Sequence, residues 1–163
     1  FYSDIDRWAF TFQMNSFISR AHKIQKSTKE NDRNTLVFSE RSIYSDKNIF
    51  AKNCYENGKM TQMEYDIYCR WNKWLSTQFY LLPDAYIYLR CNPKINSERI
   101  IKRSRNEEEN IPLSYLEQIH QKHEEWFENE TIPTLIIDAE QDFTKKEVMD
   151  DLVGKVKDFF AEI

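Results

Sequence analysis

Glycine is scarce in this sequence, with only Gly58 and Gly154 among 163 residues. A phosphate-binding loop of the form G-x-x-x-x-G-K-[ST] needs two closely spaced glycines, and these two lie far apart. The sequence as given therefore contains no such loop.

Paired cysteines, long apolar runs and an excess of positive charge are also lacking. The three cysteines, Cys54, Cys69 and Cys91, form no C-x-x-C pair, a pattern typical of reduced thiols inside cells. No apolar run approaches the roughly 20 residues that cross a bilayer. The net charge of −4 gives no basic field for nucleic acid or anionic lipid. We expect an intracellular, cytoplasmic protein without nucleic-acid or membrane partners; a mitochondrial or nuclear location stays open.

Short apolar runs alternate along the chain with segments of helical spacing. Helices are expected at about 4–27, 46–56, 61–81, 92–105, 114–127 and 144–163, and buried strands at 36–38, 85–89 and 134–137. Capping boxes are expected at Thr61, Ser114 and Thr144. Because strands that alternate with helices form parallel sheets, the sequence predicts a single α/β domain over residues 1–163.

Two charged patterns could carry chemistry. Glu40-Arg41 directly follows an apolar run, where an acid can hold magnesium and an arginine can hold an oxyanion. A solvated turn explains this pair equally well, because charged residues are common there. Arg99, Arg103 and Arg105 form a cationic patch of the kind that stabilises a transferring phosphoryl group. From spacing alone, a solvated helix end is the better explanation of the patch.

Aromatic and histidine patterns are less informative by themselves. Phe12-Gln13 could stack on a base and hydrogen-bond its edge, although spacing alone favours core packing of an amphipathic helix. His120-x-x-His123-Glu124 lacks an evident third metal ligand and is better explained as a solvated helix face. The cysteines are expected to be buried and inert.

Four strings occur in one order along the chain. They are R-W-A-F-T-F-Q from Arg7, E-R-S-I-Y-S-D from Glu40, the segment from Arg99 to Tyr115, and the segment from Asp138 to Phe143. They resemble the motifs of the deoxynucleoside kinases of the deoxycytidine, deoxyguanosine and deoxyadenosine kinase type. This resemblance implies a P-loop NTPase-like parallel sheet flanked by helices. It also implies transfer of the γ-phosphoryl group of ATP to the 5′-hydroxyl of a deoxynucleoside in nucleotide salvage.

The resemblance implies a role in binding the acceptor nucleoside for eight residues. Gln13 would hydrogen-bond the base, Phe12 and Phe50 would sandwich it, and Arg20 with Asp46 would complete its recognition. The Arg20–Asp46 pair implies deoxycytidine or a deoxypurine as substrate, not thymidine. Tyr2 and Glu108 would bind the sugar 3′-hydroxyl, with Tyr115 supporting Glu108.

The resemblance implies a second set of residues around the phosphates and the donor. Glu40 would help to hold Mg²⁺, Arg41 would position the 5′-oxygen, and Arg99, Arg103 and Arg105 would close over the phosphates as a lid. Arg41 and the lid are expected to converge on one migrating phosphate. The donor base would be contacted by Gln141, Asp142 and Phe143.

The sequence also departs from the family pattern. The missing phosphate loop implies that the chain is the C-terminal two thirds of such a kinase and turns over little by itself. Ser104 stands where the lid is expected to have glycine. A homodimer through the first helix and helix 61–81 follows from the resemblance. The alternatives are a thymidylate-type nucleoside monophosphate kinase and a non-catalytic nucleotide-binding or dimerisation module.

Overall fold

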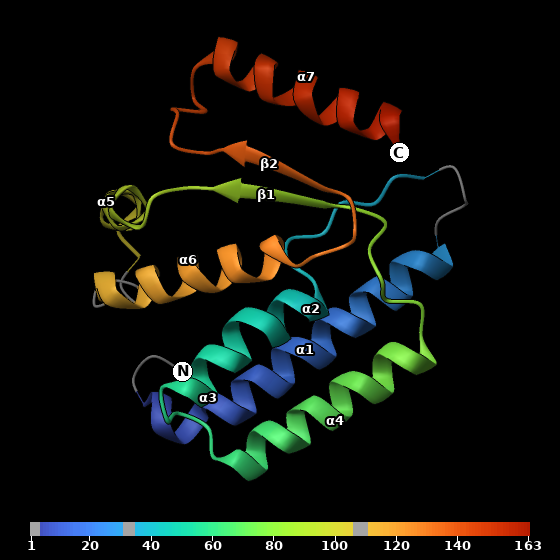
Figure 1. Cartoon of the computed structure of the whole chain (residues 1–163), viewed down its shortest axis with the longest axis vertical. Coiled ribbons are helices and arrows are strands. Elements are labelled where there is room, and N and C mark those ends of the chain that lie inside the picture. The colour runs from blue at the N-terminus through green and yellow to red at the C-terminus, as the bar shows by residue number, and fades with distance from the viewer. Residues whose placement is uncertain (1–3, 31–34, 106–110) are drawn as a thin grey trace. The chain divides into compact units, whose positions relative to one another are not determined.

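The computed structural model describes residues 4–30, 35–105 and 111–163 (Figure 1). The chain divides into two compact units, Phe1–Leu82 and Pro83–Ile163. The first unit is helical, and the second contains the sheet. The single domain expected from the sequence stays a prediction. No helix in the described ranges has both the length and the apolar character needed to span a membrane.

The first unit is built on three stretches of helix. Its elements are α1 (Ile5–Glu30), α2 (Ile43–Ser45), the π-helix η1 (Asp46–Ala51), α3 (Lys52–Glu56) and α4 (Gln62–Gln78). α1 buries Ala9, Gln13, Phe17 and Ala21, a four-residue spacing that turns one face toward the core. The Phe17 ring meets the buried ring of Tyr68 from α4 at 5.6 Å between centroids. The predicted helix at 46–56 is confirmed as the continuous run from η1 into α3.

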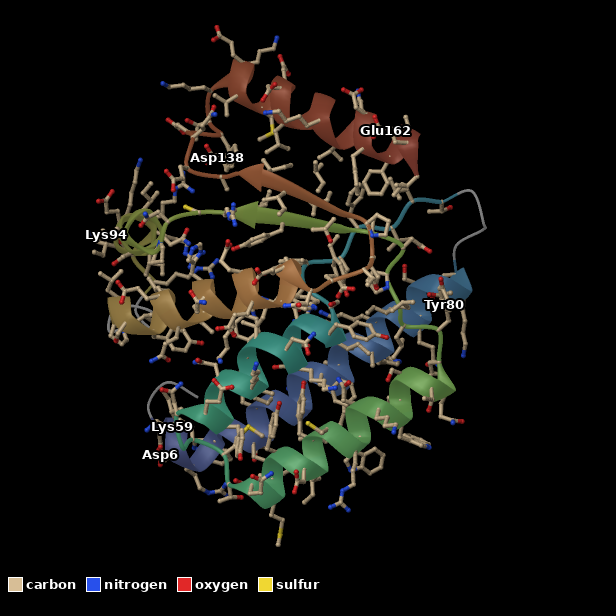
Figure 2. All side chains as sticks on the ribbon, in the orientation of Figure 1. Asp6, Lys59, Tyr80, Lys94, Asp138 and Glu162 are labelled. Atoms are coloured by element: carbon tan, nitrogen blue, oxygen red, sulfur yellow. The ribbon has the colours of Figure 1, made fainter. Side chains whose placement is uncertain are left out.

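Specific residues fix the ends of these helices. The capping box predicted at Thr61 is confirmed, because Thr61 and Glu64 bond to each other's backbone N–H groups at the start of α4. Gly58, with φ of 68°, follows α3 in the left-handed region that glycine adopts at little cost. An ion pair of 2.7 Å between Lys59 and Asp6 then ties this turn to the start of α1 (Figure 2).

The second unit is a two-stranded parallel sheet with helices on either side. β1 (Tyr86–Arg90) pairs with β2 (Thr134–Asp138), and Tyr86 lies opposite Thr134. The helices are α5 (Pro93–Arg103), α6 (Leu113–Glu128) and α7 (Lys146–Glu162). Figure 1 shows α6 and α7 on opposite sides of the strands. Both predicted strands are confirmed here, and β2 ends at Asp138 as expected (Figure 2).

Aromatic side chains join α6 to β1. The ring of Phe127 stacks on that of Tyr88 at 4.8 Å between centroids, and Trp126 meets Tyr86 edge-on at 5.1 Å. The hydroxyl of Tyr88 donates to Glu124, which also forms an ion pair with Arg90. These contacts fix the distance and the register between α6 and the strand.

The strand predicted at 36–38 is wrong. Leu36, Val37 and Phe38 have no strand conformation, and their exposed fractions are 57%, 50% and 62%. A strand is stable only when a neighbour receives its backbone hydrogen bonds. Among the described residues only β1 and β2 pair, so the run 36–38 has no neighbouring strand. Its apolar character alone was not enough to form a strand.

Two predicted capping boxes are also wrong. α6 begins at Leu113 after Pro112, which places Ser114 inside the helix, and no side chain caps its start. α7 begins at Lys146, and Thr144 instead donates its hydroxyl to Asp142 Oδ1 at 2.7 Å. At α6 the residue before the helix is Pro112, and at α7 the Thr144 hydroxyl is bonded to Asp142. In neither case does the S/T-x-x-E spacing produce a capping box.

Candidate functional site

Gln13 is a buried amide in the middle of α1. Its side chain is on the buried face of the helix and only 4% of the residue is exposed. Its Nε2 donates to Cys54 Sγ of α3 at 3.6 Å. Phe12, the preceding residue, is 43% exposed and lies off that buried face. The predicted base-binding amide is therefore held between two helices.

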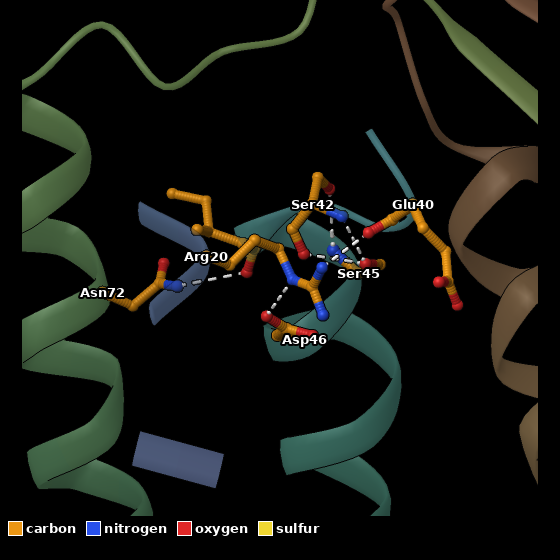
Figure 3. A network of polar contacts seen from close by, with 7 residues as sticks. Arg20, Glu40, Ser42, Ser45, Asp46 and Asn72 are labelled. Carbon is orange, nitrogen blue, oxygen red and sulfur yellow. Dashed lines mark hydrogen bonds and ion pairs between the residues drawn. The ribbon is translucent and has the colours of Figure 1, made fainter. Parts of the chain in front are cut away.

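Arg20 and Asp46 form an ion pair inside the first unit. Arg20 Nε donates to Asp46 Oδ2 at 2.8 Å, and Arg20 Nη1 donates to the backbone oxygen of Glu40 at 2.5 Å (Figure 3). Only 2% of Asp46 is exposed. Burial raises the pKa of its carboxyl, while the hydrogen bond and charge of Arg20 and the charge of Arg41 lower it. The family resemblance predicted this pair, and the structure confirms that the two residues, 26 positions apart in the sequence, are in contact.

The segment Arg41–Ser45 presents its residues through a specific turn. Ser42 and Ser45 cap each other, with Ser45 N donating to Ser42 Oγ at 3.1 Å and Ser42 N donating to Ser45 Oγ at 2.9 Å. The buried amide of Asn72 on α4 donates to the backbone oxygen of Ile43 at 3.3 Å (Figure 3). The sequence did not lead us to predict the mutual capping of Ser42 and Ser45 or the hydrogen bond from Asn72. The S-x-x-S spacing of the two serines resembles that of a capping box and could have indicated the first of these contacts.

Arg41 has an unusual backbone conformation. Its φ is 64°, a region that a non-glycine residue occupies only when its surroundings enforce it. Its guanidinium lies over the Phe50 ring at 4.1 Å from the centroid. Phe50 belongs to η1, and single turns of π-helix occur frequently at functional sites. Arg41 is thus close to Phe50, and its charge also acts on Asp46.

Arg99 on α5 holds the loop that follows β2. It donates to the backbone oxygens of Ala139, Glu140 and Gln141 at 2.6, 2.9 and 3.0 Å. Its guanidinium also lies 5.9 Å from the Phe143 ring centroid. The start of α5 joins the same loop, since Asn92 N donates to Glu140 Oε1 at 3.1 Å. The predicted lid helix and the predicted donor-base loop therefore form one hydrogen-bonded assembly.

The remaining predicted residues are placed as follows. Asp142 accepts from the Thr144 hydroxyl and N–H, and these bonds lower the pKa of its carboxyl. Arg103 ends α5, and Arg105 follows Ser104, whose φ is 54°. Tyr115 lies half-buried in the first turn of α6. Tyr2 and Glu108 lie outside the described residues.

The predicted residues fall into two groups, one in each unit. Gln13, Arg20, Arg41, Asp46 and Phe50 belong to the first unit, and Arg99, Gln141 and Phe143 to the second. Arg41 and Arg103 belong to different units, so their expected convergence on one phosphate stays a prediction. The expectation that Cys54 is buried is confirmed, but its contact with Gln13 was not foreseen.

Glu40 is an exposed carboxylate immediately before Arg41. Within the described ranges, no group of three or more His, Cys, Asp or Glu side chains could hold a metal ion. A single carboxylate nevertheless fits Mg²⁺ as nucleotide enzymes bind it, because that ion keeps several waters and takes its other ligands from phosphates.

Comparison with known proteins agrees with this geometry. A family model described as deoxynucleoside kinase matches residues 1–161. The chain belongs to the deoxynucleoside kinase family. Deoxycytidine kinases of Bos taurus and Homo sapiens are 40% and 39% identical to this kinase over 99% of its chain and 67% of theirs. A mitochondrial deoxyguanosine kinase of Xenopus laevis is 37% identical over 98% of this chain and 66% of its own.

The kinase chain thus spans about two thirds of the length of these relatives. Its α/β architecture, with a small parallel sheet flanked by helices, is consistent with a kinase of this family. Neither the monophosphate-kinase alternative nor the non-catalytic alternative gains support from the family match.

Proposed function

We propose that the kinase transfers the γ-phosphoryl group of ATP to the 5′-hydroxyl of deoxycytidine or a deoxypurine nucleoside, and disfavours thymidine. The observation that carries this proposal is the ion pair of 2.8 Å between Arg20, which is partly buried, and Asp46, which is buried, in a chain that belongs to the deoxynucleoside kinases. A buried ion pair contributes little net stability unless its remaining hydrogen-bonding capacity is used. A polar base edge would use that capacity.

The residues that the resemblance assigns to the acceptor nucleoside would contact its base and its sugar. Gln13, Arg20 and Asp46 would hydrogen-bond its base, and Phe12 and Phe50 would stack on it. Tyr2 and Glu108 would bind the sugar 3′-hydroxyl, with Tyr115 supporting Glu108. An acid at that position repels phosphate, which suits a nucleoside acceptor and disfavours a nucleotide.

The phosphates would be held by charge. Glu40 would bind Mg²⁺, and Arg41 would position the 5′-oxygen and stabilise the charge that develops on the transferring group. Arg103 and Arg105 would close over the phosphates. This is catalysis by positioning and electrostatics, which phosphoryl transfer generally requires.

The donor base would lie against the loop that follows β2. Gln141, Asp142 and Phe143 would contact it. Arg99, which fixes three backbone oxygens of that loop, would set the shape of the donor site as well as belong to the lid. The multiple bonds of Arg99 support this double role, since a residue engaged with phosphate alone would have no need of them.

We also propose that the kinase forms a homodimer through α1 and α4. Trp71 and Trp74 support this, because they lie one helical turn apart on α4 and are 47% and 50% exposed. Aromatic side chains are enriched at the centres of protein interfaces.

The test is an assay of the protein expressed from its complete open reading frame. With ATP and Mg²⁺, we expect phosphorylation of deoxycytidine or a deoxypurine nucleoside at least tenfold faster than thymidine. The chain 1–163, assayed in parallel, is expected to turn over little, because its sequence contains no phosphate loop. If the complete protein phosphorylates none of the four deoxynucleosides, the proposal is wrong.

A further inference from the structure

Arg41 lies between two peptide groups that are each held by a side chain. On one side, the backbone oxygen of Glu40 accepts from Arg20 Nη1 at 2.5 Å. On the other side, the backbone N–H of Ser42 donates to Ser45 Oγ at 2.9 Å (Figure 3). The φ and ψ angles of a residue are the rotations that relate its two flanking peptide planes. Bonds that hold both planes therefore hold the backbone of Arg41.

The Ser45 hydroxyl makes two bonds to the residue that follows Arg41. It accepts from Ser42 N, and it donates to Ser42 O at 2.7 Å. Ser42 and Ser45 are buried, with exposed fractions of 7% and 6%. Water therefore cannot easily replace these bonds, and a buried polar group that loses its partner is destabilised. Removal of the Ser45 hydroxyl would release both peptide groups of Ser42.

Asn72 ties the same turn to α4. Its Nδ2 donates to the backbone oxygen of Ile43 at 3.3 Å, and both residues are buried. Ile43 also belongs to the apolar core of the first unit, together with Tyr68 of α4. Bonds within the turn fix its internal shape, and the bond from Asn72 fixes that shape to the core.

The backbone conformation of Arg41 sets the direction of its side chain. With φ of 64°, its guanidinium lies over the Phe50 ring at 4.1 Å from the centroid. A residue that carries a Cβ atom disfavours this region and, when released, returns to negative φ. The Cα–Cβ bond would then leave the chain in another direction and carry the guanidinium away from Phe50. An arginine that is already held in place needs no rearrangement when charge develops on the transferring group.

We propose that Ser45 is a positioning residue, which keeps Arg41 in the left-handed conformation in which it acts on the transferring phosphoryl group. Asn72 supports this role from α4. The inference rests on the proposed function, which gives Arg41 its part in phosphoryl transfer. It adds two buried residues, one on α2 and one on α4, that set the rate of the reaction through Arg41.

The test is a double-mutant cycle between Ser45→Ala and Arg41→Ala, in protein made from the complete open reading frame. The substrate is the deoxynucleoside that the wild type phosphorylates fastest. Alone, Ser45→Ala should lower kcat about tenfold and change the Kd for the nucleoside less than about threefold, because Arg41 acts mainly in the transition state. In the Arg41→Ala background it should lower kcat less than about twofold, since no guanidinium is left to position.

Three further variants separate positioning from folding. Ser45→Thr keeps the hydroxyl and should retain kcat within about threefold of the wild type. Asn72→Leu, close in size, should lower kcat about fivefold alone and less than about twofold with Arg41→Ala. The control is Ser76→Ala, because the half-buried Ser76 hydroxyl donates to backbone oxygens of its own helix, and kcat should not change. Each kcat is expressed per nucleoside-binding site, counted by equilibrium titration, so a smaller folded fraction does not alter it.

The outcomes distinguish the two proposals. If the wild type phosphorylates none of the four deoxynucleosides, the proposed function fails, and this inference fails with it. If the wild type is active but Ser45→Ala lowers kcat by the same factor with and without Arg41, the proposed function stands and the positioning role is refuted. An unchanged kcat in Ser45→Ala alone would also refute it. If Ser45→Ala does not fold, the cycle of Asn72→Leu with Arg41→Ala decides by the same criterion.

Discussion

At the scale of single residues, the first unit places polar groups where burial makes each of them costly. Asp46 and Gln13 are 2% and 4% exposed, and each has a partner on another segment. Arg41, in the same unit, has a left-handed backbone conformation with φ of 64°. Buried polar pairs and strained residues of this kind cluster at functional sites, since packing alone gives no reason to retain them.

Arg41→Ala tests the catalytic role of that strained residue. We expect kcat to fall by at least about 100-fold, while the Kd for the nucleoside changes by less than about threefold. The charge that Arg41 would stabilise develops mainly in the transition state. Steady-state kinetics and equilibrium titration on the same preparation measure the two quantities. Near-normal turnover would refute the role.

Tyr68→Phe tests the cost of an unpartnered hydroxyl. The Tyr68 hydroxyl is buried and has no hydrogen-bond partner among the residues that the structure describes, whereas the Tyr88 hydroxyl donates to Glu124 at 2.8 Å. Tyr68→Phe should raise the free energy of unfolding by about 1 kcal/mol, and Tyr88→Phe should lower it by about 1 kcal/mol. Urea unfolding of both variants gives the comparison. Equal losses in the two variants would show that Tyr68 does have a partner.

At the scale of elements, local sequence signals predicted most helices but not every boundary. Thr61 caps α4 as predicted, because Glu64, three residues later, bonds back to the N–H of Thr61. At Thr144, Asp142 takes the hydroxyl, and the predicted box is lost. The run Leu36–Phe38 shows a second limit: apolar character indicates a strand, but only a pairing partner makes one.

The end of α5 offers a test of element stability. Ser104 has φ of 54°, which costs a side-chain-bearing residue about 1 kcal/mol relative to glycine. Ser104→Gly should raise the free energy of unfolding by about 0.5 kcal/mol after the loss of the bond from Ser104 Oγ to Ile101 O. Ser104→Ala keeps the strain, loses the bond and should be destabilising. Thermal unfolding of the two variants measures this difference. If Ser104→Ala is more stable than Ser104→Gly, the explanation from backbone strain is wrong.

The contact between β1 and α6 should give a pH-dependent stability. Hydrogen bonding to Arg90, and then to Tyr88, holds the pKa of Glu124 below its ordinary value of 4.5. A lowered pKa stabilises the folded state above pH 4.5, and this contribution disappears as the pH falls through the folded-state pKa. We expect Glu124→Gln to be less stable than wild type by about 1 kcal/mol at pH 7. The difference should shrink below pH 4.5, and a constant difference in urea unfolding would exclude the ion pair as its cause.

At the scale of the whole molecule, the ordered motifs predicted the family, and the family match confirms it. The pairing of Arg20 with Asp46 also followed from the sequence, through the resemblance. The contact of Cys54 with Gln13 and the hydrogen bond from Asn72 to Ile43 did not. Each joins segments at least 29 residues apart and involves a side chain, Cys54 or Asn72, that no motif contains. Such contacts depend on how the helices pack, which periodicity does not specify.

We propose that the ion pair between Arg20 and the buried Asp46 selects the base that this kinase phosphorylates. The most direct measurement is the ratio of kcat/KM for deoxycytidine to that for thymidine, in the wild type and in Arg20→Met/Asp46→Ala, each made from the complete open reading frame. We predict a ratio of at least about 10 in the wild type that falls toward or below 1 in the double variant, since the polar groups that thymine cannot satisfy are gone. A ratio that is the same in both proteins would contradict the account.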